Sequence, residues 1–308
     1  MLERVLADGT LAAGERVVAM VSGGRDSVCL LDLAARASGV EAVTALHVNY
    51  GLREGADTDQ RHCAVLCERL GVELVVERPV RPEGPGNLQA WARDTRYAAA
   101  ARLADPRDAA VVTGHTADDQ VETILYRLAS SPSRRALLGM RRRDGRLVRP
   151  LLPFTRTETT AYCEQRGLAW RDDPSNVEAT FARNRVRNGL LPQLATIHPA
   201  AAANVLRTAE LLRDEAEVLD TLVDAEVGGI PGSPRNTVTM ERFGELHPAL
   251  RRLVLQRLAD GAAGRPVPGA ARFADQVAGL RRTGTARLDL GGGVRAVVER
   301  SVLRAERG

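Results

Sequence analysis

A short loop of small and polar residues is the segment of this sequence best suited to bind phosphate. It runs from Ser22 to Ser27 with the sequence SGGRDS, between an apolar run at 16–21 and a helical pattern at 26–37. A helix N-terminus presents free backbone N–H groups to an anion, glycine lets the backbone approach a phosphate, and serine hydroxyls donate hydrogen bonds. These residue types in this order predict a phosphate-binding loop between a strand and a helix.

The spacing within this loop excludes two common nucleotide-binding patterns. No Gly-Lys-Ser/Thr follows, as a Walker loop requires, and the glycines lack the GxGxxG spacing of dinucleotide-binding folds. Ordinary kinase chemistry and hydride transfer are therefore disfavoured. A purely structural interpretation is a simple turn in which Asp26 caps the helix.

A second group of chemically useful residues begins the fourth predicted helix. The sequence GHTADDQVET at 114–123 places Asp119 three residues before Glu122 and Asp118 four residues before it, so on a helix these carboxylates share one face. They could hold Mg²⁺ or an amine, and His115 stands beside them. The helix dipole also favours acidic residues in any first turn, an explanation that suits Asp118 best.

Both groups follow strands of a repeated strand-and-helix pattern. Apolar, β-rich runs alternate with helical patterns four times, which predicts a doubly wound α/β fold, a parallel sheet with helices on both faces. The predicted strands lie at 16–21, 41–48, 73–80 and 109–115, and the predicted helices at 26–37, 56–70, 87–104 and 117–129. Ligands bind outside the carboxyl ends of parallel strands, so we expect both groups of polar residues at one edge of the sheet.

The rest of the chain predicts a helical appendage and a second, smaller domain. An arginine-rich loop at 134–153 precedes helices near 155–166 and 181–192. Beyond it we expect a small α+β domain with a long helix, two shorter helices and a terminal β-hairpin, at 200–226, 240–259, 268–282 and 286–303. The predicted domains are therefore 1–195, which contains the phosphate loop, and 196–308.

Composition limits the class of protein. Of 308 residues, 44% are hydrophobic and 27% are charged, which is typical of a folded globular protein. No apolar run is long enough to span a membrane, and the N-terminus lacks a basic segment followed by an apolar one, so we expect a cytoplasmic protein without a membrane partner. The net charge of +4, in a chain whose basic residues apart from histidine are all arginine, is compatible with a polyanionic partner.

The two polar segments resemble those of a known superfamily. The loop SGGRDS is similar to the pyrophosphate-binding loop of the N-type ATP pyrophosphatases, or PP-loop enzymes, which activate an oxygen by adenylation and release pyrophosphate. With the pattern HxxDDxxET at 115–123, it resembles two tRNA-modifying branches, the tRNA(Ile)-lysidine synthetases and the tRNA thiolases. Thiolation usually relies on paired cysteines. The four cysteines here form no CxxC pair, so thiolation is the second interpretation.

Three further stretches resemble the lysidine synthetases and extend the resemblance from 16 to 195. They are ARDTRY at 92–97, RPLL at 149–152 with Arg156 beyond it, and DPSN at 173–176 leading to RNRVR at 183–187. The sequence departs from the family at Tyr50, where histidine is usual, at Gln89, where glutamate is common, and at Arg25, which adds a cation to the loop.

The resemblance implies a reaction and its site residues. The wobble cytidine of an isoleucine tRNA with a CAU anticodon would attack ATP through its C2 oxygen, and free L-lysine would then displace AMP to give lysidine. The implied ATP-binding residues are Ser22, Gly23, Gly24, Arg25, Asp26, Ser27, His47 and His115, with Asp26 also holding Mg²⁺. The implied lysine-binding residues are Asp119, Glu122 and Arg93, and the implied catalytic residues are Asp26, Asp119, Glu122 and Arg96.

The resemblance also implies contacts with tRNA. The proposed contacts come from the arginine-rich loop and from the segment near 185, through Arg141, Arg142, Arg143, Arg183, Asn184 and Arg187. The domain at 196–308 would bind tRNA as well, and a homodimer stays open because dimers are common in the family. The alternative is that these arginines only form a solvated or salt-bridged surface and bind no tRNA.

Two functions of other classes stay open at this point. One is a nucleotide-binding regulator with a decayed active site, which the presence of Asp26, Asp119 and Glu122 disfavours. The other is an amide-forming ligase acting on a small molecule, which the arginine-rich loop disfavours.

Overall fold

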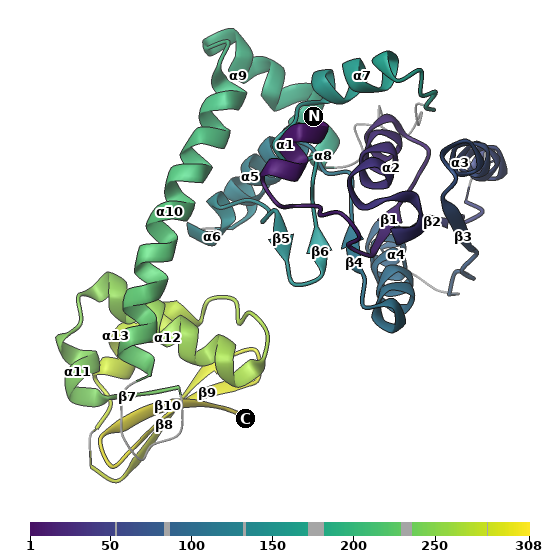
Figure 1. Cartoon of the computed structure of the whole chain (residues 1–308). Helices are drawn as coiled ribbons and strands as arrows, with labels where there is room; N and C mark the ends of the chain where they lie inside the picture. The colour runs from purple at the N-terminus through teal and green to yellow at the C-terminus, as the bar shows by residue number, and fades with distance from the viewer. Residues whose placement is uncertain (53, 83–86, 132–133, 172–181, 229–235, 282) are drawn as a thin grey trace. The chain divides into compact units, whose positions relative to one another are not determined.

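A computed structural model describes residues 1–308 apart from 53, 83–86, 132–133, 172–181, 229–235 and 282 (Figure 1). The chain forms two compact units, Met1–Glu210 and Leu211–Gly308. The division between them falls inside the long helix α10 (Ala201–Val227). The functional boundary expected between 195 and 196 stays a prediction.

The first unit contains a six-stranded sheet in the order β3-β2-β1-β4-β6-β5. Its strands are β1 (Val17–Met20), β2 (Val43–Val48), β3 (Glu73–Glu77), β4 (Ala110–Val112), β5 (Arg143–Asp144) and β6 (Leu147–Val148). All neighbours pair in parallel except β5 and β6. The predicted α/β fold class is confirmed.

The strand order places a topological switch point between β1 and β4. From β1 the chain moves outward through β2 and β3, and then returns to form β4 on the other side of β1. In doubly wound sheets such a point opens a crevice at the carboxyl ends of the two strands. The segments that follow β1 and β4 are the two polar segments singled out in the sequence.

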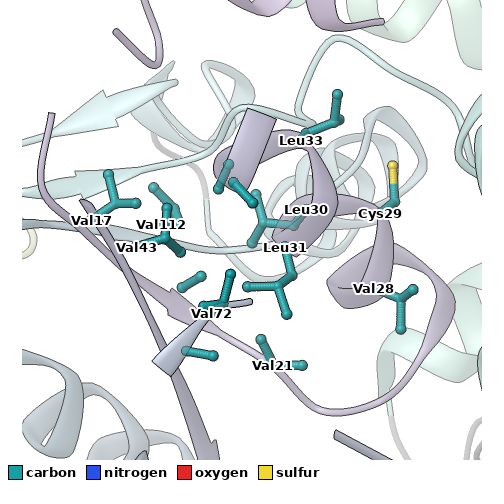
Figure 2. Close-up of a cluster of buried hydrophobic side chains, with 14 of the residues drawn as sticks. Val17, Val21, Val28, Cys29, Leu30, Leu31, Leu33, Val43, Val72 and Val112 are labelled. Carbon is teal, nitrogen blue, oxygen red and sulfur yellow. The ribbon is translucent and has the colours of Figure 1, made fainter. Parts of the chain in front are cut away.

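Successive side chains of a strand point to opposite faces of the sheet, so both faces carry apolar groups that helices cover. They are α2 (Arg25–Ser38), α3 (Ala56–Leu70), α4 (Leu88–Ala104) and α5 (Ala117–Ser130). Val17 and Val43 pack under α2 in one core cluster, part of which Figure 2 shows around Leu30 and Leu31. On the other face, Val18 packs with alanines of α4.

Helix α7 (Arg156–Gln165) packs against α2 and completes the first core. It begins at a capping box in which Thr155 and Glu158 satisfy each other's backbone N–H groups. The hydroxyl of Tyr162 donates to Asp32 on α2 at 2.5 Å. Shorter helices complete the unit: α1 (Leu2–Ala7), α6 (Arg134–Leu137), α8 (Ala182–Arg185), a π-helical turn (Val186–Leu190) and α9 (Leu191–Ile197).

The arginine-rich segment is more ordered than the sequence suggested. The expected loop at 134–153 includes α6 and a β5–β6 hairpin, which adds two strands to the sheet. Gly145 has φ +58°, a conformation that suits a two-residue hairpin turn and that glycine adopts without strain. The Asp144-Gly145 pair was the available signal for this turn.

The second unit is a small α+β domain, as expected. Its antiparallel sheet has the order β7-β10-β9-β8, from β7 (Thr237–Thr239), β8 (Thr285–Gly291), β9 (Val294–Glu299) and β10 (Val302–Arg307). The expected terminal hairpin is therefore part of a four-stranded sheet. Helices α11 (Met240–Glu245), α12 (Pro248–Ala263) and α13 (Ala274–Ala278) pack with it. The single helix expected at 240–259 is wrong, because Pro248 lacks an N–H and starts a new helix.

No helix in the described part of the chain has the length and apolar content needed to cross a membrane.

The core beneath α2 gives a stability test. Leu31 is 0% exposed, so the change Leu31→Ala removes buried methyl groups and leaves a cavity. We expect it to lower the free energy of unfolding by about 2–5 kcal/mol in denaturant titrations. Leu128 on α5 is 57% exposed, and Leu128→Ala is the control, with an expected change below about 1 kcal/mol. Equal effects of the two changes would contradict this core assignment.

Candidate active site

The predicted phosphate loop forms a tight turn between β1 and α2. Gly23 has φ +85°, which lets the chain reverse before the helix starts. The Ser22 N–H donates to the Ser27 hydroxyl at 3.1 Å, and the two hydroxyl oxygens are 3.2 Å apart. The helix begins after Gly24, so Asp26 is not its cap. The two serine hydroxyls therefore lie together beside a helix N-terminus, where an anion is favoured.

Neighbouring residues hold this loop in place through hydrogen bonds and an ion pair. The carbonyl of Gly23 accepts the Arg171 N–H at 3.0 Å, and the Arg171 side chain pairs with buried Asp59 at 2.7 Å. His47 is 4% exposed, and its Nδ1 donates to the Val21 carbonyl at 2.9 Å. His47 thus supports the strand just before the loop, and its predicted contact with ATP stays a prediction.

The second polar segment lies directly against the first. A Cβ atom on Gly114 would come within 3.0 Å of the Asp26 carbonyl and within 3.2 Å of the Ser27 nitrogen. Only a glycine allows the turn after β4 to pack so closely on the start of α2. The sheet edge therefore brings the loop and the start of α5 together, as the sequence predicted.

Asp119 and Glu122 lie together on α5, and two arginines bind them. Arg156 donates to Asp119 Oδ1 at 2.6 Å and to Glu122 Oε1 at 3.0 Å. Arg187 donates to both oxygens of Glu122, at 2.6 Å and 3.0 Å. Glu122 is only 2% exposed, so these cations offset the cost of burying its charge. The carboxylate pair is a cation-binding site, and guanidinium groups fill it here.

Electrostatics keeps Asp119 ionised. Burial opposes a charge on Asp119, but the Arg156 guanidinium and the hydrogen bond from the Thr116 N–H outweigh it and lower the pKa of Asp119. Burial likewise opposes the charge on Arg156, while Asp119 and Glu122 raise its pKa. Both partners stay charged at neutral pH. Asp118 does not cap α5, because it accepts the backbone N–H of Arg156 at 2.7 Å instead.

The two carboxylate oxygens of Asp26 have different neighbours. Its Oδ1 accepts the Thr159 hydroxyl at 2.6 Å and the Arg25 Nε at 3.2 Å, whereas its Oδ2 is 3.9 Å from Arg156. Asp26 Oδ2 accepts no hydrogen bond at these distances, and a carboxylate oxygen of this kind suits Mg²⁺, which binds through one or two carboxylates plus phosphates and waters. Among the described residues, no group of three or more acidic, histidine or cysteine side chains is placed to hold a metal ion.

Arg93 and Arg96 lie on α4 next to this site. Their guanidinium carbons are 4.8 Å and 5.9 Å from the centre of the Tyr97 ring. Burial lowers the pKa of His115 to about 4. The negative charge of Asp119 opposes this shift, and the positive charges of Arg149, Arg93 and Arg96 reinforce it. His115 is therefore neutral at pH 7, and its Nδ1 shares a hydrogen bond with the Thr113 hydroxyl at 2.9 Å.

The residues predicted to bind tRNA fall in different places. Arg142 pairs with Asp8 at 3.1 Å and Arg143 with Glu15 at 3.1 Å, while the Arg141 side chain is exposed. Arg187 contacts Glu122 and Asp119 rather than an open surface. Asn184 is buried, 9% exposed. The side chain of Arg183 and the DPSN segment at 173–176 lie outside the described residues.

Sequence reasoning missed several members of the site. It noted Arg156 without a role, although this residue contacts three carboxylates, and it did not single out Thr159 or Gly114. Arg156 and Thr159 come from α7, which lies far along the chain from α2 and α5. Their position at the start of a helix directly after RPLLPF was the available signal.

Comparisons with known proteins agree with this geometry. The sequence pattern of the PP-loop domain matches residues 2–194. The chain is 39% identical over 213 residues to the tRNA(Ile)-lysidine synthase of Pseudomonas fluorescens, covering 67% of this chain and 48% of that protein. It is 39% identical over 264 residues to the tRNA(Ile)-lysidine synthase of Thermus thermophilus, covering 83% of this chain and 51% of that protein. The chain thus spans about half the length of the curated relatives it matches.

A solved structure shares the fold at low sequence identity. The U34-tRNA thiolase NcsA from Methanococcus maripaludis, which carries a [4Fe-4S] cluster, aligns with a TM-score of 0.57 and 18% identity. The alignment covers 69% of this chain and 76% of the thiolase. This likeness concerns the fold alone.

The pKa of His115 predicts how stability depends on pH. The pKa falls from 6.5 in the unfolded chain to about 4 in the folded protein, so only the unfolded state binds the proton between these values. The stability that neutral His115 contributes is therefore present above pH 6.5 and lost as pH falls toward 4. Between pH 7 and pH 5 we expect the wild type to lose roughly 2 kcal/mol more than His115→Gln in denaturant titrations. Parallel pH curves for the two proteins would contradict this.

Proposed function

This chain belongs to the PP-loop family, and we propose that it uses ATP to adenylate the wobble cytidine of an isoleucine tRNA and then joins L-lysine to that base. The observation that carries the proposal is the close packing, at one switch point, of a phosphate loop against the turn that leads to a carboxylate pair holding two guanidinium groups. ATP and an amine are the two ligands that such a pair of subsites fits. The similarity to proteins named tRNA(Ile)-lysidine synthase supports lysine as the amine.

The loop suits the activation step. Backbone N–H groups at the start of α2 and the hydroxyls of Ser22 and Ser27 would bind the pyrophosphate of ATP. When bound, Mg²⁺ neutralises charge on the phosphate oxygens, and Asp26 is the residue that would hold it. Attack of the cytidine C2 oxygen on the α-phosphorus forms the new P–O bond and expels pyrophosphate. Positioning and charge neutralisation dominate such a step, so it needs no covalent nucleophile from the protein.

The carboxylate pair suits the second step. Asp119 and Glu122 would bind the amino groups of lysine in place of guanidinium groups. The ε-amine, once deprotonated, attacks C2 of the cytidine, the C–O bond to AMP breaks, and AMP leaves with the electron pair. His115 has its pKa lowered to about 4 and is therefore a neutral group near these carboxylates. It can accept a hydrogen bond there without adding a positive charge that repels the amine.

Thiolation stays the second interpretation, and the cysteines weigh against it. A reactive or metal-binding cysteine must be accessible as a thiolate. Cys29, Cys63, Cys67 and Cys163 are all buried. Burial raises the pKa of Cys63 to about 12 and that of Cys67 to about 11, so both stay protonated.

We propose that the second unit binds tRNA, together with Arg141, Arg142, Arg143 and Arg183 in the first. A homodimer and a cytoplasmic location stay predictions.

Incorporation of labelled lysine tests the proposed function directly. With ATP, Mg²⁺ and an isoleucine tRNA transcript bearing CAU, we expect label to enter the tRNA. Glu122→Gln keeps the shape of the side chain but removes the charge that holds the amine, and Asp26→Asn removes the carboxylate for Mg²⁺. Each change should lower the rate by about 100-fold or more. Glu245→Gln, an exposed change in the second unit, should leave the rate near that of the wild type.

Two results would refute parts of this proposal. Pyrophosphate release with tRNA but no lysine uptake would leave the ATP reaction intact and refute lysine as the acceptor. Full activity of both Asp26→Asn and Glu122→Gln would refute the site.

The salt dependence of tRNA binding tests Arg141. This exposed arginine has no carboxylate partner among the described residues, whereas Arg142 and Arg143 are paired. If Arg141 contacts a phosphate, Arg141→Gln should weaken tRNA binding and reduce the slope of log K against log salt by about 1. Arg61→Gln on α3 makes the same change in net charge and is the control. Identical slopes for the two variants would remove Arg141 from the interface.

A further inference from the structure

A buried hydroxyl on α7, that of Thr159, contacts the aspartate of the phosphate loop. Thr159 is 0% exposed, and its Oγ1 is 2.6 Å from Asp26 Oδ1 on α2. The same Oγ1 is 3.0 Å from the Arg156 carbonyl, but a hydroxyl has only one proton to donate. The shorter distance and the negative charge of the carboxylate assign this proton to Asp26, because hydrogen bonds to ionised acceptors are the shorter and stronger kind.

This bond is not needed to satisfy the hydroxyl itself. Thr160, the next residue on α7, donates to the Arg156 carbonyl at 2.8 Å, which is a common arrangement for a threonine within a helix. Thr159 is close enough to do the same, yet it bonds to a carboxylate on another helix. Asp26 does not need the bond for its burial either, because its side chain is 22% exposed and also accepts from Arg25. The contact therefore fixes a direction, that of the Asp26 carboxylate.

The packing of α7 determines where the Thr159 hydroxyl lies. One turn further along this helix, the Tyr162 hydroxyl donates to buried Asp32 on α2 at 2.5 Å, and Arg166 pairs with the same carboxylate at 3.3 Å. Residues spaced by three and four positions share one face of a helix, so 159, 162 and 166 all face α2. This face holds α7 along α2 with Thr159 opposite Asp26. A hydroxyl held in this way orients the carboxylate instead of following it.

Two guanidinium groups compete with a metal ion for Asp26. Arg25 Nε is 3.2 Å from Asp26 Oδ1, and Arg156 Nε is 3.9 Å from Oδ2. The terminal torsion of an aspartate is soft, and a rotation that shortens the second distance would turn Oδ2 into a partner of Arg156. An oxygen used in this way is lost to Mg²⁺, which relies on one or two carboxylates. The bond from Thr159 opposes that rotation because it holds Oδ1.

We propose that Thr159 is a positioning residue, which orients the Asp26 carboxylate so that Oδ2 stays available to the Mg²⁺ that accompanies ATP. This inference rests on the proposed function, in which Asp26 holds Mg²⁺, and adds the residue that sets the direction of that carboxylate. It also gives a consequence to Arg25, the cation by which this loop departs from the family pattern. The loop carries a competitor for its own aspartate, and a hydroxyl from α7 offsets it.

Equilibrium binding of α,β-methylene-ATP tests this inference without turnover, since its carbon bridge prevents the release of pyrophosphate. The dissociation constant is measured by isothermal titration calorimetry with the full chain, in excess Mg²⁺ and again in EDTA. We expect Mg²⁺ to tighten binding by the wild type. Thr159→Val removes the hydroxyl and keeps nearly the same shape, so it should weaken binding by about 10-fold in Mg²⁺ and by less than about 2-fold in EDTA.

Three further variants separate positioning from folding. Thr159→Ser retains the hydroxyl and should bind within about 3-fold of the wild type in Mg²⁺. Thr160→Val makes the same chemical change one residue away, where the hydroxyl donates to the backbone of its own helix, and should alter neither dissociation constant. The double variant Thr159→Val with Asp26→Asn should bind no more weakly than Asp26→Asn alone, because Thr159 acts through Asp26.

The dependence on Mg²⁺ decides between a positioning and a structural role. Equal losses in Mg²⁺ and in EDTA for Thr159→Val would show a structural role and overturn the inference, as would additive losses in the double variant. Wild-type binding that does not respond to Mg²⁺ overturns it as well. If the expected Mg²⁺-dependent losses appear but no labelled lysine enters the tRNA, the inference is supported, whereas lysine as the acceptor in the proposed function is refuted.

Discussion

The site depends on one guanidinium group, that of Arg156, which touches carboxylates from two different helices. It donates to Asp119 and Glu122 on α5 and lies 3.9 Å from Asp26 on α2. Without this cation, three carboxylates would converge at a half-buried sheet edge and repel one another, and removing one partner from a buried pair typically costs about 3–5 kcal/mol. The capping box and the core contacts of α7 fix the position of Arg156 in turn. The geometry of the candidate site therefore depends on how well α7 packs.

The strand order explains why these charges meet at all. Because β4 returns to the side of β1 opposite β2, the turns after both strands leave the sheet at the same edge. Gly114 then allows backbone contact between them. The same edge receives Arg149 from β6 and the arginines of α4, so positive and negative groups lie close together.

Local sequence patterns predicted the elements much better than the contacts between them. The four strand-and-helix pairs follow from apolar runs, turn residues and helical periodicity, and the helix expected at 56–70 has those limits in the structure. The switch point follows from the rules for parallel sheets once the strands are known. Arg156 and Thr159 could not be placed on Asp26 in this way, because α7 reaches α2 through tertiary packing and no local pattern encodes that distance. For the same reason the sequence pointed Arg187 toward tRNA and gave no sign that it binds Glu122.

The two arginines on the carboxylate pair are not equally replaceable by a substrate amine. Arg156 is anchored, since its own backbone N–H donates to Asp118 and its helix is packed in the core. Arg187 belongs to the π-helical turn at Val186–Leu190, outside the core contacts that hold α7, and its side chain contacts Glu122 and Asp119. An incoming ammonium that takes over its hydrogen bonds leaves the net charge of the pair unchanged, so the exchange costs little electrostatic energy.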